Sequence, residues 1–428
     1  MGTPAPASGL IAGVNAETIA IGSELLTAFK QDTNSLFLTA KLNELGVNVD
    51  FKTVVGDRRS DLVGTIRVAL GRADILILMG GLGPTEDDLT REAAAEALGL
   101  ELRRDPEIAA WLYKRFAARR IKMAENNLKQ ADVVAGAEVL KNARGSAPGQ
   151  FLKTEFQGRP KIVMLLPGPP REIHPMFEEQ CMQRLRDVVP ARNIATRVLK
   201  IALIPESEAD RRAALIYTRY SDIETTILAH RGEIQLHLRA QAATLDEAKQ
   251  KVDTLASELE DEFDDAVFST GGETLEQIVG YYLQMRGANL SVAESCTGGM
   301  ISQRITSVPG SSRYFVGGAV VYDNSLKASF ADVPPLLIKE HGAVSREVAA
   351  ALAEGIRKRC STSLGVGVTG IAGPGGGTEE KPVGLVFHAI SDGKTTDVIE
   401  RHFPGDRDLI RYWATTQALD MVRRRLMQ

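Results

Sequence analysis

Three side chains in the last third of the chain have the types and spacing needed for acyl transfer without a histidine. Ser295 follows an apolar run and precedes Gly298 and Gly299, while Tyr322 and Lys327 follow a second apolar run. A hydroxyl at a strand-to-helix turn becomes a nucleophile when a base takes its proton, and a desolvated lysine can be that base at neutral pH. The N–H groups at the start of the following helix, near residues 296–298, or those of residues 370–373 could then stabilise an oxyanion. We interpret Ser295 as the candidate nucleophile, Lys327 as the base and Tyr322 as a proton relay or a support for the lysine.

Each of these residues also has a structural interpretation. A serine before a helix is favoured as its N-cap, and on position alone we favour that role for Ser295. A tyrosine at the end of an apolar strand is commonly a core residue, and a lysine five residues later is commonly exposed. Only the combination indicates catalysis. A Ser–His–Asp triad built with His341, His388 or His402 has no supporting motif.

A glycine-rich segment, residues 370–377, follows the apolar run 364–368 and has five glycines in eight residues. Such a loop lets backbone N–H groups approach a phosphate or a planar ring, whereas the alternative is a mobile surface loop. Its position at a strand end favours ligand binding, because α/β sheets bind ligands there. The G-x-G-x-x-G match over 365–370 lies inside the strand and opens no helix, so we do not interpret it as a dinucleotide fingerprint.

A second candidate site lies near residue 80. The run Gly80-Gly81-Leu82-Gly83-Pro84-Thr85 follows an apolar strand and precedes Asp87 and Asp88. Glycines between a strand end and a helix start make a phosphate cradle, and the carboxylates could coordinate Mg²⁺ bridging to that phosphate. Alternatively, both aspartates only favour the helix start. Asp57, which follows the strand ending at Val55, is a third acidic candidate, and no G-x-x-x-x-G-K-[ST] motif is present.

The elements that must position these residues alternate between strand and helix. Continuous apolar strands alternating with helices from Glu17 to about Val188 predict a parallel sheet covered on both faces. Residues 197–268 predict a small α+β module, and the rest predicts a second α/β unit. We therefore predict a flexible tail over 1–16 and domains over 17–190, 191–268 and 269–428.

Composition limits the possible classes of protein. The 428 residues are 44% hydrophobic and 25% charged, and the net charge of −4 argues against a general binder of nucleic acids or anionic membranes. The three cysteines, Cys181, Cys296 and Cys360, form no C-x-x-C pattern, which fits a reducing cytoplasm. No apolar run approaches the roughly 20 residues of a membrane helix, and the first residues lack the features of a signal peptide. We expect a cytoplasmic protein without membrane contact.

The C-terminal residues resemble the C-terminal domain of the competence/damage-inducible protein A (CinA) family. The matching runs, in chain order, are Ala293-Glu294-Ser295-Cys296-Thr297-Gly298-Gly299, 308–312, Tyr322-Asp323-Asn324 with Lys327, 341–345, 369–377 and 381–384. That domain is a nicotinamide mononucleotide (NMN) deamidase without a metal, which implies Ser295 as nucleophile assisted by Tyr322 and Lys327. Asp323 stands where many relatives have Ser, and we expect its side chain to point away from that of Tyr322. The resemblance implies substrate contacts from Cys296, Thr297, Gly298, Gly317, Gly318, Asn324, Thr369, Gly370, Ala372, Gly373, Pro374 and Gly376.

The N-terminal residues resemble the molybdopterin-binding-like domain of the same family. The match runs from residues 22–26 through 54–57, 80–90 and 126–127 to 166–170. The resemblance implies a divalent-metal-dependent ADP-ribose pyrophosphatase, with Asp57 and Asp88 as the foremost metal or catalytic carboxylates and Asp87 beside them. Molybdopterin processing is the alternative. The phosphate and ADP-ribose contacts expected from this match are Glu24, Asn34, Gly80, Gly81, Gly83, Pro84, Thr85, Asn126 and Gly168.

The middle module resembles the KH-like domain of the family but lacks the G-x-x-G loop that clamps nucleic acid, so we expect a spacer or a dimer contact and no nucleic-acid partner.

Together these features predict an α/β protein with a doubly wound N-terminal domain, an α+β middle domain and a C-terminal α/β domain. We expect a bifunctional hydrolase acting on NMN and ADP-ribose, as a homodimer, the commonest oligomer. The rival from another class is a non-catalytic adaptor in competence or the damage response.

Overall fold

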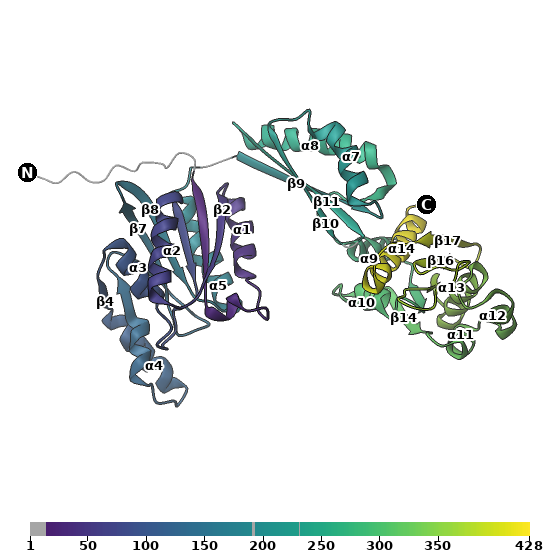
Figure 1. Ribbon diagram of the computed structural model, residues 1–428, viewed down its shortest axis with the longest axis horizontal. Helices are drawn as coiled ribbons and strands as arrows, with labels where there is room; N and C mark the ends of the chain where they lie inside the picture. The colour runs from purple at the N-terminus through teal and green to yellow at the C-terminus, as the bar shows by residue number, and fades with distance from the viewer. Residues whose placement is uncertain (1–13, 191–192, 231) are drawn as a thin grey trace, which may run out of the picture. The chain divides into compact units, whose positions relative to one another are not determined.

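The computed structural model describes residues 14–190, 193–230 and 232–428, and the chain divides into two compact units between Asn193 and Ile194 (Figure 1). Most of the predicted tail, 1–16, lies outside the described residues. Asn15 and Ala16, however, begin the first strand, which corrects that boundary. Ala16 is fully buried beside Ile75 of a neighbouring strand, so it belongs to the core of unit 1. In the part of the chain that the structure describes, no helix is both long and apolar enough to cross a bilayer.

Unit 1 is a six-stranded sheet with the order β2-β1-β3-β8-β7-β6, in which the first four strands are parallel and the last two antiparallel. One apolar core, with Leu38 and Ile173, covers one face, and another, with Leu62 and Ala93, covers the other. The predicted two-sided sheet is therefore confirmed. Its elements are β1 (Asn15–Ile21), α1 (Asn34–Glu44), β2 (Asn48–Val55), α2 (Arg59–Arg72), β3 (Ile75–Met79), α3 (Thr90–Leu98), α4 (Pro106–Ala118), β6 (Glu138–Leu140), β7 (Gly149–Phe156), β8 (Arg159–Leu166), α5 (Pro170–Met176) and α6 (Met182–Arg186); β4 (Leu102–Arg104) and β5 (Asp132–Val134) pair separately.

Unit 2 begins with a four-stranded sheet of order β10-β11-β9-β12. Alternation along β11 places Leu236, Leu238 and Ala240 in a core shared with two helices, as the sequence predicts. The elements are β9 (Asn193–Ala202), α7 (Glu206–Tyr217), β10 (Ile223–His230), β11 (Glu233–Ala242), α8 (Leu245–Phe263) and β12 (Val267–Ser269).

The remainder of unit 2 is a five-stranded sheet of order β14-β13-β15-β16-β17. The first three strands are parallel, so their carboxyl ends meet at one edge, where Ser295, Val321 and Ile371 continue the chain. The elements are α9 (Leu275–Met285), β13 (Leu290–Glu294), α10 (Met300–Thr306), β14 (Phe315–Val320), α11 (Asn324–Ala331), α12 (Pro335–His341), α13 (Arg346–Cys360), β15 (Leu364–Gly370), β16 (Leu385–Ser391), β17 (Thr396–His402) and α14 (Arg407–Met427).

A buried arginine joins the two sheets of unit 2. The guanidinium of Arg304 donates to the carboxylates of Glu233, at 2.9 Å, and Glu276, at 2.7 Å, and to the hydroxyl of Thr416. These partners lie on β11, α9 and α14. Because a buried guanidinium is stable only when its donors are satisfied, this cluster fixes the KH-like module against the C-terminal sheet.

Candidate functional site

A cavity of about 210 Å³ lies at the carboxyl edge of the C-terminal sheet. It brings Ser295, Tyr322 and Lys327 together, although they come from two separate strand ends. Ten residues line it: Ser295, Cys296, Tyr322, Asn324, Lys327, Ala343, Val344, Thr369, Gly370 and Ala372. The convergence that spacing alone leaves open is therefore present in the folded chain.

The fully buried carboxylate of Glu294 fixes the turn that carries Ser295. It accepts hydrogen bonds from the N–H groups of Gly299, Ile301 and Ser302 and from the Ser302 hydroxyl, at 2.7–3.1 Å. Helix α10 starts only at Met300, after a turn in which Gly298 and Gly299 have φ of 60° and 92°. A left-handed backbone strains other residues, so the glycines permit this turn.

This arrangement corrects two expectations for Ser295. The residue is not the N-cap, since Gly299 holds that position. Nor does the first turn of α10 offer its N–H groups to an oxyanion, because Glu294 occupies them. The Gly298 N–H donates to the Ser295 carbonyl. Within the described residues, no backbone oxygen accepts a hydrogen bond from the N–H groups of Cys296 and Thr297. Both N–H groups are directed at the Cys296 sulfur, so they are candidate oxyanion donors on this turn only if a substrate oxygen takes the place of that weak acceptor.

Lys327 is buried, against the commoner expectation of an exposed lysine. It is only 2% exposed, and its Nζ donates to the Tyr322 carbonyl at 3.0 Å and to the Asn324 side-chain oxygen at 3.2 Å. Burial lowers the pKa of Lys327 below its ordinary value, although the nearby Asp323 carboxylate opposes that shift. The shift favours the neutral amine that a general base needs.

Tyr322 differs from the core tyrosine considered above. It is 57% exposed, and its hydroxyl accepts a hydrogen bond from Arg407 at 2.9 Å. Tyr322 holds Lys327 through its main-chain carbonyl and not through its hydroxyl. The side chain of Asp323 points to Ser325, whose N–H it accepts as the N-cap of α11. Arg407, which also donates to the Gly373 carbonyl, had no recognisable signal in the sequence.

The residues expected to contact NMN fall into two groups. Cys296, Asn324, Thr369, Gly370 and Ala372 line the cavity. Of the rest, Gly317 and Gly318 lie within β14, where a Cβ on Gly318 would stand 2.5 Å from a methyl of Val292, so this glycine serves close strand packing. Ala343 and Val344 line the cavity without having been assigned a role, although they fall in a matching run. The expected residues that do not line the cavity are Thr297, Gly298, Gly317, Gly318, Gly373, Pro374 and Gly376.

No histidine lines this cavity. The imidazole of His388 is fully buried at 3.0 Å from the Ala414 carbonyl, and burial lowers its pKa to about 3. His341 and His402 are exposed and lie near Glu347 and Glu400. The geometry therefore offers Ser295 a lysine and no imidazole.

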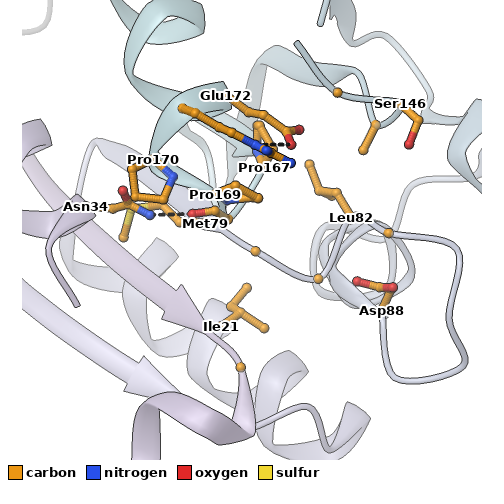
Figure 2. Close-up of a pocket in the computed structure, with 18 of the residues that line it drawn as sticks. Ile21, Asn34, Met79, Leu82, Asp88, Ser146, Pro167, Pro169, Pro170 and Glu172 are labelled. Carbon is orange, nitrogen blue, oxygen red and sulfur yellow. Dashed lines mark hydrogen bonds and ion pairs between the residues drawn. The ribbon is translucent and has the colours of Figure 1, made fainter. Parts of the chain in front are cut away.

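Unit 1 has a larger cavity, of about 780 Å³, at the carboxyl ends of β1 and β3 (Figure 2). The glycine loop after β3 forms one wall, and residues 167–172 form another. Gly81 has a φ of 63°, and a Cβ there would stand 2.2 Å from the Thr90 hydroxyl, so only glycine fits. Asn34 donates to the Gly168 carbonyl at 2.7 Å and so joins α1 to the second wall.

The three candidate carboxylates, Asp57, Asp87 and Asp88, all line this cavity. Asp88 accepts the Thr85 N–H at 2.9 Å, and Asp57 accepts the Ser23 N–H at 2.8 Å. Asp87 and Asp88 are not the N-cap of α3, because that helix starts at Thr90 and its N-cap is Leu89. Among the described residues, no three or more His, Cys, Asp and Glu side chains are grouped to hold a metal ion. The lining aspartates could still hold Mg²⁺, because this ion keeps several waters and takes only one or two carboxylates together with phosphate oxygens.

Of the other residues expected at this site, some line the cavity and two do not. Glu24, Asn34, Gly80, Gly81, Gly83, Pro84 and Gly168 line the cavity, whereas Thr85 and Asn126 do not. Thr85 instead positions Asp88, to which its N–H and hydroxyl donate. Sequence reasoning missed the basic lining residues Arg115, Arg119 and Arg144, because nothing local connects them to a loop near residue 80.

Comparison with known proteins agrees with this architecture. Family models match in chain order: a probable molybdopterin binding domain over 17–187, a damage-inducible protein CinA KH domain over 196–269 and a CinA C-terminal domain over 272–426. The fold is thus a three-domain α/β architecture, as predicted.

Relatives that match along almost the whole chain are CinA-like proteins. The chain is 61% identical over 412 residues to a CinA-like protein of Koribacter versatilis, covering 96% of this chain and 100% of that protein. It is 48% identical over 413 residues to a CinA-like protein of Solibacter usitatus, covering 96% and 98%. A structure of the competence/damage inducible protein CihA from Agrobacterium tumefaciens is 36% identical over 36% of this chain and 96% of that chain, with a TM-score of 0.35. The chain belongs to the CinA family of competence/damage-inducible proteins.

Replacing Glu294 by Gln should destabilise unit 2. An amide cannot accept from all the donors that the carboxylate satisfies, and unpaired buried donors should lower the free energy of unfolding by about 3 kcal/mol. Urea unfolding followed by Trp413 fluorescence, in a Trp111→Phe background, measures this. The exposed Glu340→Gln is the matched control, and equal stability of the two variants would contradict the assigned role.

Proposed function

We propose that the C-terminal domain hydrolyses the carboxamide of NMN to nicotinate mononucleotide and ammonia. The observation that carries this proposal is the joint placement of Ser295 and the buried Lys327 in one cavity. The resemblance to the CinA C-terminal domain supplies the substrate. Because no residue of this cavity needs a metal for the chemistry below, the proposed deamidation is metal-independent.

The hydrogen bonds of Lys327 support its role as the base. A neutral amine has two N–H bonds and one lone pair, and its two acceptors are the Tyr322 carbonyl and the Asn324 side-chain oxygen. The lone pair then remains available for the proton of Ser295. In the described residues, the Ser295 hydroxyl has no hydrogen-bond partner, so it is free to turn toward a substrate or the amine. Catalytic hydrogen bonds often form only once substrate is bound.

The proposed reaction has two steps. Lys327 takes the proton of Ser295 as the serine oxygen bonds to the carboxamide carbon, and the N–H groups of Cys296 and Thr297 stabilise the oxyanion. The carbon–nitrogen bond breaks, and ammonia leaves with the proton carried by Lys327. Water, deprotonated by Lys327, then cleaves the acyl-enzyme and restores Ser295. Arg407 holds the Tyr322 hydroxyl beside the cavity through both steps.

Replacing Ser295 by Ala should abolish ammonia release from NMN, because the acyl-enzyme cannot form. A coupled ammonia assay on the full chain measures this, with the exposed Ser363→Ala as control. Ammonia release that persists in Ser295→Ala would show that Ser295 is not the nucleophile. Absence of release from the folded wild type would reject the deamidase and favour the adaptor alternative for this domain.

The rate of NMN deamidation should fall as the pH falls through the pKa of Lys327, because the protonated amine cannot act as a base. Since burial lowers that pKa, the midpoint should lie below the roughly 10.4 of an ordinary lysine. Lys327→Met should lose about 10²–10⁴-fold in kcat and the pH dependence with it. A profile of kcat/KM against pH tests this, and a midpoint unchanged in Lys327→Met would assign the titration to another group.

A second candidate function is the hydrolysis of ADP-ribose to AMP and ribose 5-phosphate in unit 1. It is supported by a cavity in which a glycine loop and the carboxylates Asp57, Asp87 and Asp88 face the same space. Asp57 and Asp88 would hold Mg²⁺, which when bound neutralises charge on the pyrophosphate. The backbone around Gly81 would orient the phosphates. Molybdopterin processing remains the alternative for this site.

Asp88→Asn should reduce ADP-ribose hydrolysis by about 10²-fold or more, through loss of both a metal ligand and the Thr85 contact. Chromatographic measurement of AMP release with Mg²⁺ tests this, and chelation by EDTA should suppress the wild type. Asp61→Asn, an exposed change on α2, is the matched control. Full activity in the presence of EDTA would exclude the metal.

A further inference from the structure

The charged side chains that line the unit 1 cavity are not all accounted for by a pyrophosphate and its metal. Lys30 pairs with Glu24 at 2.8 Å, and Arg171 lies 3.8 Å from Glu172. With these pairs set aside, the lining still carries two separate groups of opposite charge. The acidic group consists of Asp32, Asp57, Asp87 and Asp88. The basic group consists of Arg115 from α4, Arg119, which is the C-cap residue of α4, and Arg144 from the loop after β6.

None of these three guanidinium groups has a carboxylate at ion-pair distance within the described part of the chain. Other arginines of unit 1 are paired, for instance Arg104 with Asp132 and Arg184 with Glu138. Arg115 is half-buried, its guanidinium lies 5.2 Å from the ring centre of Trp111, and its Nε is buried without an acceptor. Within the described residues, no carboxylate pairs with the Arg115 guanidinium, so an anionic ligand in the cavity would not have to displace one.

The positive charge continues along the end of α4. Residues 114–122 contain five cations, and no Asp or Glu occurs between 108 and 124. Arg115, Phe116, Arg119 and Ile121 of this segment line the cavity. The wall formed by α4 is therefore basic, and it comes from a different element than the glycine loop and the aspartates.

We propose that the substrate of this site carries a phosphate monoester in addition to its pyrophosphate, and that Arg115, Arg119 and Arg144 bind it. This inference rests on the proposed pyrophosphatase. A monoester is close to a dianion at neutral pH and has three acceptor oxygens, which match the forked donors of arginine. The pyrophosphate of ADP-ribose is assigned to the glycine loop and the metal, so it leaves these three arginines without an anionic partner.

The substrate class is an ADP-ribose phosphorylated on a ribose hydroxyl, with ADP-ribose 2′-phosphate as the probe. In its hydrolysis, one phosphorus–oxygen bond of the pyrophosphate breaks and the oxygen of water bonds to that phosphorus. The proton released from water goes to the leaving phosphate. The products are adenosine 2′,5′-bisphosphate and ribose 5-phosphate, and the monoester is not cleaved.

The test compares kcat/KM of the full chain for ADP-ribose 2′-phosphate and for ADP-ribose, with Mg²⁺ at fixed ionic strength. We expect the wild type to prefer the phosphorylated nucleotide by about tenfold or more, since charge-assisted hydrogen bonds contribute that much. In Arg115→Gln/Arg119→Gln the ratio should fall toward 1, with Arg144 as the only one of the three arginines left. Arg186→Gln, an exposed arginine of α6 outside the cavity, is the matched control and should keep the wild-type ratio.

Equal kcat/KM for both nucleotides in the wild type, or a preference that is undiminished in the double variant, would overturn the inference. If neither nucleotide is hydrolysed, the proposed pyrophosphatase fails and titration calorimetry decides the inference separately. Tighter binding of ADP-ribose 2′-phosphate that the double variant loses would support the arginine site. Equal binding of the two nucleotides, or no binding of either, would reject it.

Discussion

The buried carboxylate of Glu294 is the constraint on which the C-terminal site depends. It ends β13 and accepts the first donors of α10, so the residues between them must form a turn of fixed shape. Ser295 begins that turn, and Gly298 and Gly299 allow its left-handed backbone. A charged acceptor buried without water stabilises only one arrangement of its donors, because any other leaves the charge unsatisfied. Glu294 thus determines where the Ser295 hydroxyl lies, although its own oxygens face away from the chemistry.

Burial destabilises the charged form of the Lys327 amine and so lowers its pKa. Its ammonium form has only two protein acceptors and little contact with water, so the folded chain favours the neutral amine. The Glu294 carboxylate accepts hydrogen bonds from four donors, whereas burial of the Lys327 amine lowers its pKa. Glu294 ends β13, and Lys327 lies on α11, the helix that follows the neighbouring strand β14. Because β13 and β14 are parallel, both groups lie at the same edge of the sheet. The local chemistry of the proposed deamidase thus follows from two different degrees of hydrogen-bond satisfaction.

Unit 1 uses the same edge of a parallel sheet with different side chains. Its glycine loop brings backbone close to the cavity, and aspartates take the place of the serine and lysine. Thr85 fixes Asp88 while Ser23 fixes Asp57, so the carboxylates are oriented by neighbouring loops and not by a helix start. Arg115 and Arg119, at the end of α4, add a cationic wall that the proposed binding of a pyrophosphate by the glycine loop and the metal does not require.

The sequence by itself determined the strands, the glycine loops and the family. Apolar runs such as 74–79 predict buried parallel strands wherever they occur, and the ordered motifs around Ser295 and Gly80 are local. Sequence could not decide whether Ser295 caps a helix, because that depends on Glu294 reaching past it to the donors of α10. It also left open the burial of Lys327, the exposure of Tyr322 and the contacts of Arg407 and Arg115, which join elements far apart in the chain. Burial and hydrogen-bond satisfaction are properties of the packed chain, so only the tertiary structure decided them.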